Sequence, residues 1–203
     1  MKRDEIVMHD KLNFDMTNKR YNNTTKWYCI DSSNNNIKVR YLLGKGEVSK
    51  DTIIVIGVNP STADENKEDS TMTRVKSKLE NNSFVMLNIF PLRSTKPSDL
   101  PKDKDLDELH RDIHRENLKA ISYVLNEIGN DIKVWCAWGS TIDDRLYLKE
   151  YLKDIYNLLN KYNTKYYYRG PISKKGNPHH PLYVSDECNF KTFKMDEYIN
   201  NFQ

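Results

Sequence analysis

Short blocks of branched apolar residues alternate along the chain with longer stretches whose apolar residues recur every three or four positions. Apolar blocks of this length are typical of buried strands, and the longer spacing is typical of amphipathic helices. The alternation predicts an α/β fold, a three-layer α/β/α sandwich around a central, mainly parallel four-stranded sheet. The four strands are expected at 52–56, 83–87, 132–137 and 164–168, with helices at 105–128, 143–162 and near 190–202.

The amino-terminal part of the chain has a different character. Residues 1–36 are polar and rich in Asn, and they predict a partly irregular extension in which Trp27 to Ile30 forms a small strand. Residues 37–203 are expected to form the α/β domain, beginning with a short strand at 38–43. A chain of 203 residues suits one domain with a sizeable core.

Polar residues follow several of the predicted strands. The first parallel strand stops at Gly57 to Thr62, where Gly and Pro force a turn. The carboxyl ends of parallel strands meet at one edge of a sheet, where α/β proteins bind ligands. The residues expected to converge there are Asn59, Asn88, Ser140 and His180.

Composition narrows the class of protein only moderately. The chain is 37% hydrophobic and 30% charged, with a formal net charge of +3, which permits nucleic-acid binding without indicating it. It has no apolar stretch that could span a bilayer and its start is polar, so a cytoplasmic protein without a membrane partner is expected. The three cysteines are far apart and form no CxxC pair, which favours reduced thiols.

Each candidate side chain has an ordinary structural interpretation beside its functional one. Asn59 and Asn88 can shape turns, or an amide can read the edge of a base. His180 can be an exposed turn residue or can stabilise an anion. Asp64 and Asp69 can lie in a solvated loop or hold magnesium, and Asp69 can equally cap a helix that runs to Leu79. We predict neither a cofactor nor a metal site.

Two families share these motifs in the same order. The chain resembles the family named domain of unknown function 1643 over about 39–183, through Asn59 to Asp64, Asn88 to Thr95, Ala137 to Gly139 and Gly176 to Tyr183. More distantly, it resembles the uracil-DNA glycosylase superfamily. That resemblance is carried by Gly57 to Ser61, Leu87-Asn88, Trp138-Gly139 and the His180-Pro181 loop.

The glycosylase resemblance implies a uracil-DNA-glycosylase-like fold and a role for each matching residue. Asn59 would position a water molecule and His180 would donate toward the developing oxyanion. Asn88, with Phe90, Gly57 and Ser61, would form the pocket of a base taken out of the stack. The residues expected to contact nucleic acid are Arg74, Arg93, Ser140, Leu182 and Tyr183.

One departure from the superfamily determines the functional prediction. Its strongest members have a carboxylate where this chain has Asn59, and an amide cannot act as a base. The leading hypothesis is therefore a protein that binds DNA, or alternatively single-stranded DNA or RNA, through a base pocket with weak or absent uracil excision. The alternatives are an active glycosylase for a modified or mismatched base, and a metal-dependent enzyme that acts on free nucleotides.

Overall fold

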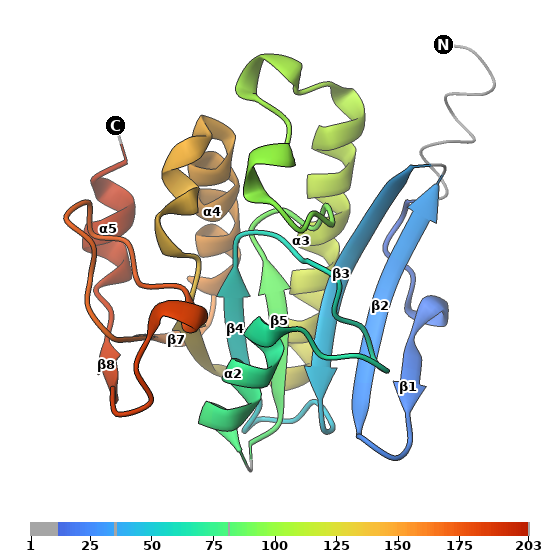
Figure 1. Ribbon diagram of the computed structural model, residues 1–203, viewed down its shortest axis with the longest axis horizontal. Coiled ribbons are helices and arrows are strands. Elements are labelled where there is room, and N and C mark those ends of the chain that lie inside the picture. The colour runs from blue at the N-terminus through green and yellow to red at the C-terminus, as the bar shows by residue number, and fades with distance from the viewer. Residues whose placement is uncertain (1–11, 35, 81, 203) are drawn as a thin grey trace.

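The protein folds around one mixed sheet with helices on both faces (Figure 1). The computed structural model describes residues 12–34, 36–80 and 82–202. The sheet has eight strands in the order β1-β2-β3-β5-β4-β6-β7-β8. The strands are β1 Arg20–Asn22, β2 Trp27–Asn34, β3 Ile37–Lys45, β4 Ile53–Gly57, β5 Phe84–Asn88, β6 Asp131–Cys136, β7 Asn163–Arg169 and β8 Phe190–Thr192.

The α/β class is confirmed, but the prediction of a four-stranded sheet is wrong in size. The four predicted parallel strands are the centre of the sheet, because β5, β4, β6 and β7 pair in parallel. Antiparallel strands extend the sheet on both sides: β3, β2 and β1 beyond β5, and β8 beyond β7. Adjacent β-strands of this kind need no helical crossover, so the βα alternation did not reveal them.

The part of the chain that the structure describes has four α-helices. They are α2 Ser70–Leu79, α3 Glu108–Ile128, α4 Leu146–Leu159 and α5 Met195–Asn200. None of them is long and apolar enough to cross a membrane. In Figure 1, α2 lies in front of the sheet, and α3 and α4 lie behind it.

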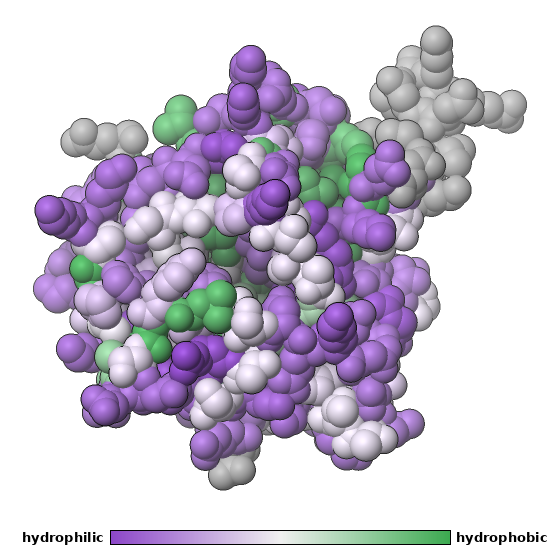
Figure 2. Space-filling view, in the orientation of Figure 1, coloured by the Kyte–Doolittle hydropathy of each residue, from purple (hydrophilic) through white to green (hydrophobic). Residues whose placement is uncertain are grey.

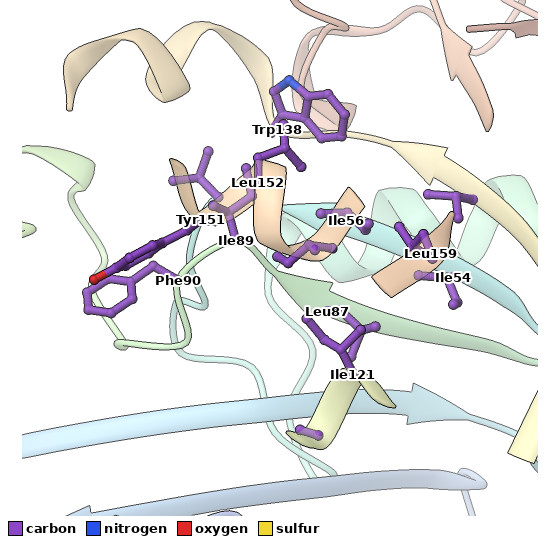
Figure 3. Packing of buried hydrophobic residues seen from close by; sticks show 14 of the residues in the cluster. Ile54, Ile56, Leu87, Ile89, Phe90, Ile121, Trp138, Tyr151, Leu152 and Leu159 are labelled. Atoms are coloured by element: carbon purple, nitrogen blue, oxygen red, sulfur yellow. The ribbon is translucent and has the colours of Figure 1, made fainter. Parts of the chain in front are cut away.

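Alternate strand residues face the two helical layers, as the period of two in a strand requires. Ile54, Ile56 and Leu87 belong to the hydrophobic cluster that includes α3, α4 and α5 (Figure 3). Val55 and Met86 belong to the cluster that includes α2. This alternation confirms a three-layer arrangement.

Both ends of the chain are more regular than the sequence indicated. Residues 20–34 of the expected extension form two strands of the main sheet, while residues 1–11 lie outside the described part of the chain. The terminal segment begins with the edge strand β8 and ends with the short helix α5, where one helix near 190–202 was expected. Both differences come from strand pairing between segments far apart in sequence, which local periodicity does not report.

Gly44 provides a direct test of how closely β2 and β3 pack. Gly44 lies opposite Tyr28, and a methyl group on it would lie 2.1 Å from Cζ of the Tyr28 ring. We expect Gly44→Ala to lower the free energy of unfolding by about 1–3 kcal/mol, because the buried ring must move. Urea denaturation measures this change. In a Tyr28→Leu background the same substitution should cost much less, and equal costs in both backgrounds would contradict the packing.

Candidate functional site

A cavity lies at the carboxyl ends of the central parallel strands. Its volume is about 520 Å³, which is within the usual range for sites that bind small molecules. Figure 2 shows the face that carries α2 as mainly hydrophilic, with a hollow near its centre. The lining comes from Arg40 on β3, Met86 on β5, the end of β4 with the turn after it, and the start of α2. The rest comes from residues within 138–141 and 179–183, with further residues at 94–97.

Asn88 ends β5 beneath this cavity. Its side chain is fully buried, and neither Oδ1 nor Nδ2 has a hydrogen-bond partner among the described residues. Its backbone carbonyl is satisfied, because it accepts a hydrogen bond of 2.9 Å from Nδ2 of Asn117. Only the side-chain atoms of Asn88 therefore lack hydrogen-bond partners. Buried polar groups without partners are uncommon and point to a function or a missing ligand.

Gly57 has no side chain, and this makes room for the Asn88 amide. The two residues are paired across β4 and β5, so their side-chain positions face the same layer. A methyl group on Gly57 would lie 3.3 Å from Oδ1 of Asn88 and 2.6 Å from Cε of Met86. Met86 lines the cavity from the same strand and the same face as Asn88. Asn88 itself does not line the cavity, and its amide is buried next to Gly57 and Met86, which do.

Asn59 lines the cavity and also holds its wall. Its Nδ2 donates to the carbonyl of Pro60 at 3.1 Å and to the carbonyl of Ser94 at 2.9 Å. Only its side-chain oxygen remains to accept a further hydrogen bond. The same loop is fixed by Arg93, whose guanidinium donates to the carbonyl of Ser61 at 2.8 Å.

His180 lies on the opposite wall, next to Gly139. Its Nδ1 accepts a hydrogen bond of 3.3 Å from the backbone N–H of Leu182, so in the neutral ring the proton is on Nε2. Burial lowers the pKa of His180 below its ordinary value, and the charge of Asp69 opposes this shift. The φ angle of Gly139 is +67°, and a side chain there would lie 3.1 Å from Cβ of His180. This close approach and the positive φ angle explain why a glycine follows Trp138.

A chain of buried hydrogen bonds connects the cavity wall to the carboxyl-terminal helix. Trp138 donates through Nε1 to the hydroxyl of Tyr198 at 3.1 Å, and that hydroxyl donates to Oδ1 of Asn177 at 2.6 Å. Nδ2 of Asn177 then donates to Asp143 at 2.6 Å. These bonds fix the segment that follows β6 against the loop that carries His180. Sequence reasoning did not identify Tyr198 or Asn177 as part of the site.

Phe90 does not line the cavity, so the prediction of a stacking ring there is wrong. The residue is fully buried on the other face of the sheet, and its ring centroid is 5.7 Å from that of Tyr151 (Figure 3). Two residues further along the chain than Asn88, it has already left the strand, so strand alternation does not hold its side chain on the cavity face. The exposed ring on the cavity is that of Tyr183.

Neither predicted phosphate-binding arginine lines the cavity. Arg93 forms an ion pair with Asp31 at 3.1 Å, in addition to its bonds to the loop after β4. Arg74 on α2 forms an ion pair with Asp186 at 2.8 Å near the rim, where it keeps 38% of its side-chain surface exposed. Arg93 is thus committed to internal contacts, whereas Arg74 is accessible from solvent.

The remaining predicted residues lie on the wall and rim of the cavity. Ser61, Ser140, Leu182 and Tyr183 all line it. Leu182 is 36% exposed and Tyr183 is 78% exposed, so an apolar side chain and an aromatic ring project beside the opening. The structure therefore brings Gly57, Asn59, Ser61, Ser140 and His180 to one cavity. Asn88 is buried beneath Gly57 and does not line it.

The two aspartates considered for magnesium have structural partners. Asp69 accepts a hydrogen bond of 2.9 Å from the backbone N–H of Met72 and caps α2, and it also lines the cavity. Asp64 accepts hydrogen bonds from the backbone N–H groups of Asn66 and Lys67. Within the described residues, no group of three or more His, Cys, Asp or Glu side chains is placed to hold a metal ion.

Sequence reasoning missed one charged residue of the cavity. Arg40 lies within β3 and is only 2% exposed, although it is one of the cavity residues. The sequence did contain a signal, because Arg40 interrupts the apolar strand Val39 to Leu43. An arginine at such a position needs a polar environment inside the fold.

The comparisons with known proteins agree with the resemblance to an uncharacterised family. The model of the family described as protein of unknown function (DUF1643) matches residues 40–182, which is more than half of the chain. The chain therefore belongs to this family. No curated protein and no solved structure matches it.

Tyr198→Phe tests the hydrogen bonds behind the cavity wall. The substitution removes the hydroxyl between Trp138 and Asn177, and both buried partners lose a hydrogen bond. We expect the free energy of unfolding to fall by about 1–3 kcal/mol in urea denaturation. The control is Tyr162→Phe, which removes an exposed hydroxyl bonded to Asn126 and should have little effect. Equal effects of the two changes would contradict the role of the buried network.

His180 should make the fold less stable in acid. Because its pKa is lowered in the folded protein, the unfolded chain binds a proton more readily. This contribution to stability is complete above about pH 6.5 and is lost as the pH falls through the lowered pKa. We expect His180→Asn, whose amide oxygen can still accept the Leu182 N–H, to reduce the loss of stability between pH 7.5 and pH 5. Identical pH profiles from chemical denaturation would contradict this assignment.

Proposed function

We propose that this member of the DUF1643 family binds nucleic acid and holds one extruded nucleobase beside Asn88, with weak or no excision of uracil. The unpaired amide of Asn88 carries the proposal. An amide has a donor and an acceptor side by side, which complements adjacent groups on the edge of a pyrimidine. Each unsatisfied buried group costs about 1–3 kcal/mol, and hydrogen bonds to a base would recover that cost.

The order of the motifs around the cavity supports a relationship to the uracil-DNA glycosylase superfamily. Gly57, Asn88, Gly139 and His180 come from the four segments that carry the resemblance, and all four lie at or beneath one cavity. Chance matches of short motifs would have no reason to meet at one site. We therefore extend the proposal to the fold, as a larger, mixed-sheet relative of the glycosylase architecture.

Access to Asn88 requires a movement of Met86. Both amide atoms of Asn88 are shielded from solvent, and Met86 lies on the same face of β5 and lines the cavity. Methionine is unbranched and has several rotatable bonds, so it can change rotamer at low cost. A base that enters the cavity would displace this side chain and take its place against the amide.

Weak excision follows from the side chains that face the base. Asn59 cannot accept a proton from water as a carboxylate does, and its Nδ2 is already committed to the loop. Neutral His180 retains one N–H that can donate to a base oxygen. The site can therefore bind and polarise a base, but Asn59 does not activate the water that must attack the sugar.

Groups at the rim suit the strand that flanks an extruded base. Tyr183 offers an exposed ring for stacking, and Leu182 can enter the space that the base vacates. Arg74 on α2 is a partly exposed cation that pairs with Asp186, three residues after Tyr183. With a net charge of only +3, we expect DNA affinity to be moderate and to fall with salt.

One observation favours a second candidate, an active glycosylase for a modified or mismatched base. Asp69 places a carboxylate on the cavity wall, and its charge acts on His180. A carboxylate there could stabilise the cationic sugar, although one of its oxygens caps α2. Asp69→Asn tests this role cleanly, because Asn is an equally good cap but carries no charge.

Asn88→Ala should weaken oligonucleotide binding without destabilising the fold, since the lost side-chain atoms have no partners in the free protein. We expect affinity for oligonucleotides with an unpaired uracil to fall by about tenfold or more. Fluorescence anisotropy at several salt concentrations, on single-stranded DNA, duplex DNA and RNA, measures this. The matched control is Asn163→Ala, which removes an exposed amide at the opposite end of the parallel strands.

Single-turnover assays on the same oligonucleotides separate the two candidates. We expect almost no release of uracil from the native protein. Efficient release of uracil that Asn88→Ala abolishes would refute the proposal of weak or absent excision. Release of a modified base that Asp69→Asn abolishes would establish the second candidate. Native affinity that is unchanged in Asn88→Ala would refute the base pocket itself.

A further inference from the structure

Arg40 is a buried cation that forms no ion pair with the described residues. Its neighbours in β3, Val39 and Tyr41, are fully buried, and Arg40 itself is 2% exposed. Nη1 donates to the carbonyl of Ala63 at 2.9 Å, whereas buried Nε has no partner among the described residues. The side chain lines the cavity. Charged side chains are seldom buried to this extent unless they are paired.

Two nearby carboxylates are already paired with other arginines, and a third, Asp69, whose charge also acts on Arg40, caps α2. Arg20 pairs with Asp31 at 2.5 Å and with Glu65 at 2.9 Å, and Arg93 pairs with Asp31 at 3.1 Å. Arg20 and Arg93 therefore occupy these two carboxylates. Within the described residues, Arg40 is the one of the three arginines that makes no ion pair, and it is the one that lines the cavity.

The fold does not need the hydrogen bond that Arg40 makes. Its single hydrogen-bond acceptor, the carbonyl of Ala63, also accepts a bond of 3.0 Å from Arg93 and would remain satisfied without it. Burial lowers the pKa of Arg40 to about 10, and the charge of Arg93 contributes to that shift. At neutral pH the guanidinium is therefore still charged, and its burial opposes folding.

We propose that Arg40 is the anion-binding residue of the cavity and takes the phosphate of the nucleotide whose base contacts Asn88. This inference rests on the proposed function for the identity of the base. A guanidinium presents its donors in a planar fork that matches two phosphate oxygens. β3 is adjacent to β5 in the sheet, so Arg40 and Asn88 come from neighbouring strands. One ligand that carries both a base and a phosphate would satisfy both unpaired side chains.

Residues at the start of α2 also affect how well the cavity would bind a phosphate. The hydroxyl-bearing residues Ser70 and Thr71 line the cavity at the start of α2, a ten-residue helix whose amino end favours anions. The carboxylate of Asp69 lines the cavity as well and repels an anion. We therefore expect Asp69→Asn, which keeps the helix cap, to strengthen phosphate binding.

Arg40→Met provides the test, because methionine fills a similar volume without the charge. Binding would be followed by thermal shift and calorimetry with three probes: inorganic phosphate, deoxyuridine 5′-monophosphate and deoxyuridine. We expect the native protein to bind the monophosphate about tenfold or more tightly than the nucleoside, and Arg40→Met to abolish that preference. The melting temperature of the unliganded variant should be unchanged or higher, since an unpaired buried charge is removed.

The matched control is Arg111→Met, which removes an exposed arginine on α3 and should leave phosphate binding unchanged. If Arg40→Met does not fold, Arg40→Lys keeps the charge without the fork and should weaken binding of the monophosphate but not of deoxyuridine. Binding of inorganic phosphate alone, lost in Arg40→Met, would support a phosphate site and assign it to the free ion. Binding of the monophosphate that no Arg40 variant changes, or no phosphate-dependent binding at all, would overturn the inference.

The outcomes also separate this inference from the function on which it rests. Oligonucleotide binding that depends on Asn88 but not on Arg40 would overturn the inference and leave the proposed function intact. Phosphate binding that depends on Arg40, without any affinity for oligonucleotides, would refute nucleic-acid binding and retain the anion site.

Discussion

The candidate site depends on one strand pair, the parallel pairing of Gly57 in β4 with Asn88 in β5. This register places the glycine directly beside the amide, where even a methyl group would come within 3.3 Å of Oδ1. The pairing continues beyond the strands, since Ile89 donates to the carbonyl of Gly57 and Phe90 to that of Val58, both at 2.9 Å. A shift of one residue would turn the Asn88 side chain to the opposite face of the sheet, away from α2. The chemistry of the cavity is thus set by backbone hydrogen bonds in the centre of the fold.

The segments that form the cavity walls are each held in place by separate hydrogen bonds. Nδ2 of Asn59 holds the Ser94 segment, Arg93 holds the carbonyl of Ser61, and the Trp138–Tyr198–Asn177 bonds hold the wall after β6. These polar side chains are satisfied by the protein itself. Asn88 and Arg40 are buried more completely than Asn59 or Arg93, and both keep donors or acceptors without partners among the described residues. We therefore separate the side chains that maintain the cavity from the two that we propose to contact a ligand.

The sequence predicted those parts of the fold that local periodicity encodes. The four central strands and the helices α3 and α4 were located within a few residues. Of the four side chains expected to converge, Asn59, Ser140 and His180 line one cavity and Asn88 is buried beneath it. The antiparallel strands on both sides of the sheet were not predicted as parts of it, because pairing between distant segments depends on tertiary contacts. Phe90 was expected in the pocket through the glycosylase resemblance, but it lies on the other face of the sheet because the strand ends before it. Arg40 was overlooked because a charged residue in a short strand ordinarily faces solvent, and only the complete sheet shows that this strand is covered.

The positions of Asn88 and Arg40 imply a conflict between stability and ligand binding in this fold. A buried amide without partners and a buried guanidinium without an ion pair both oppose folding, and apolar residues of similar size would remove that penalty. Other buried polar atoms also lack partners among the described residues, such as the hydroxyls of Tyr147 and Tyr151 in the core. Of the residues with such atoms, Arg40 and His179 line the cavity and Asn88 lies beneath it. A site that must accept both a hydrogen-bonding edge and a negative charge needs these groups to be unpaired before the ligand arrives, because any internal partner would compete with it. On this reasoning the unsatisfied atoms of Asn88 and Arg40 are those that the proposed ligand would satisfy.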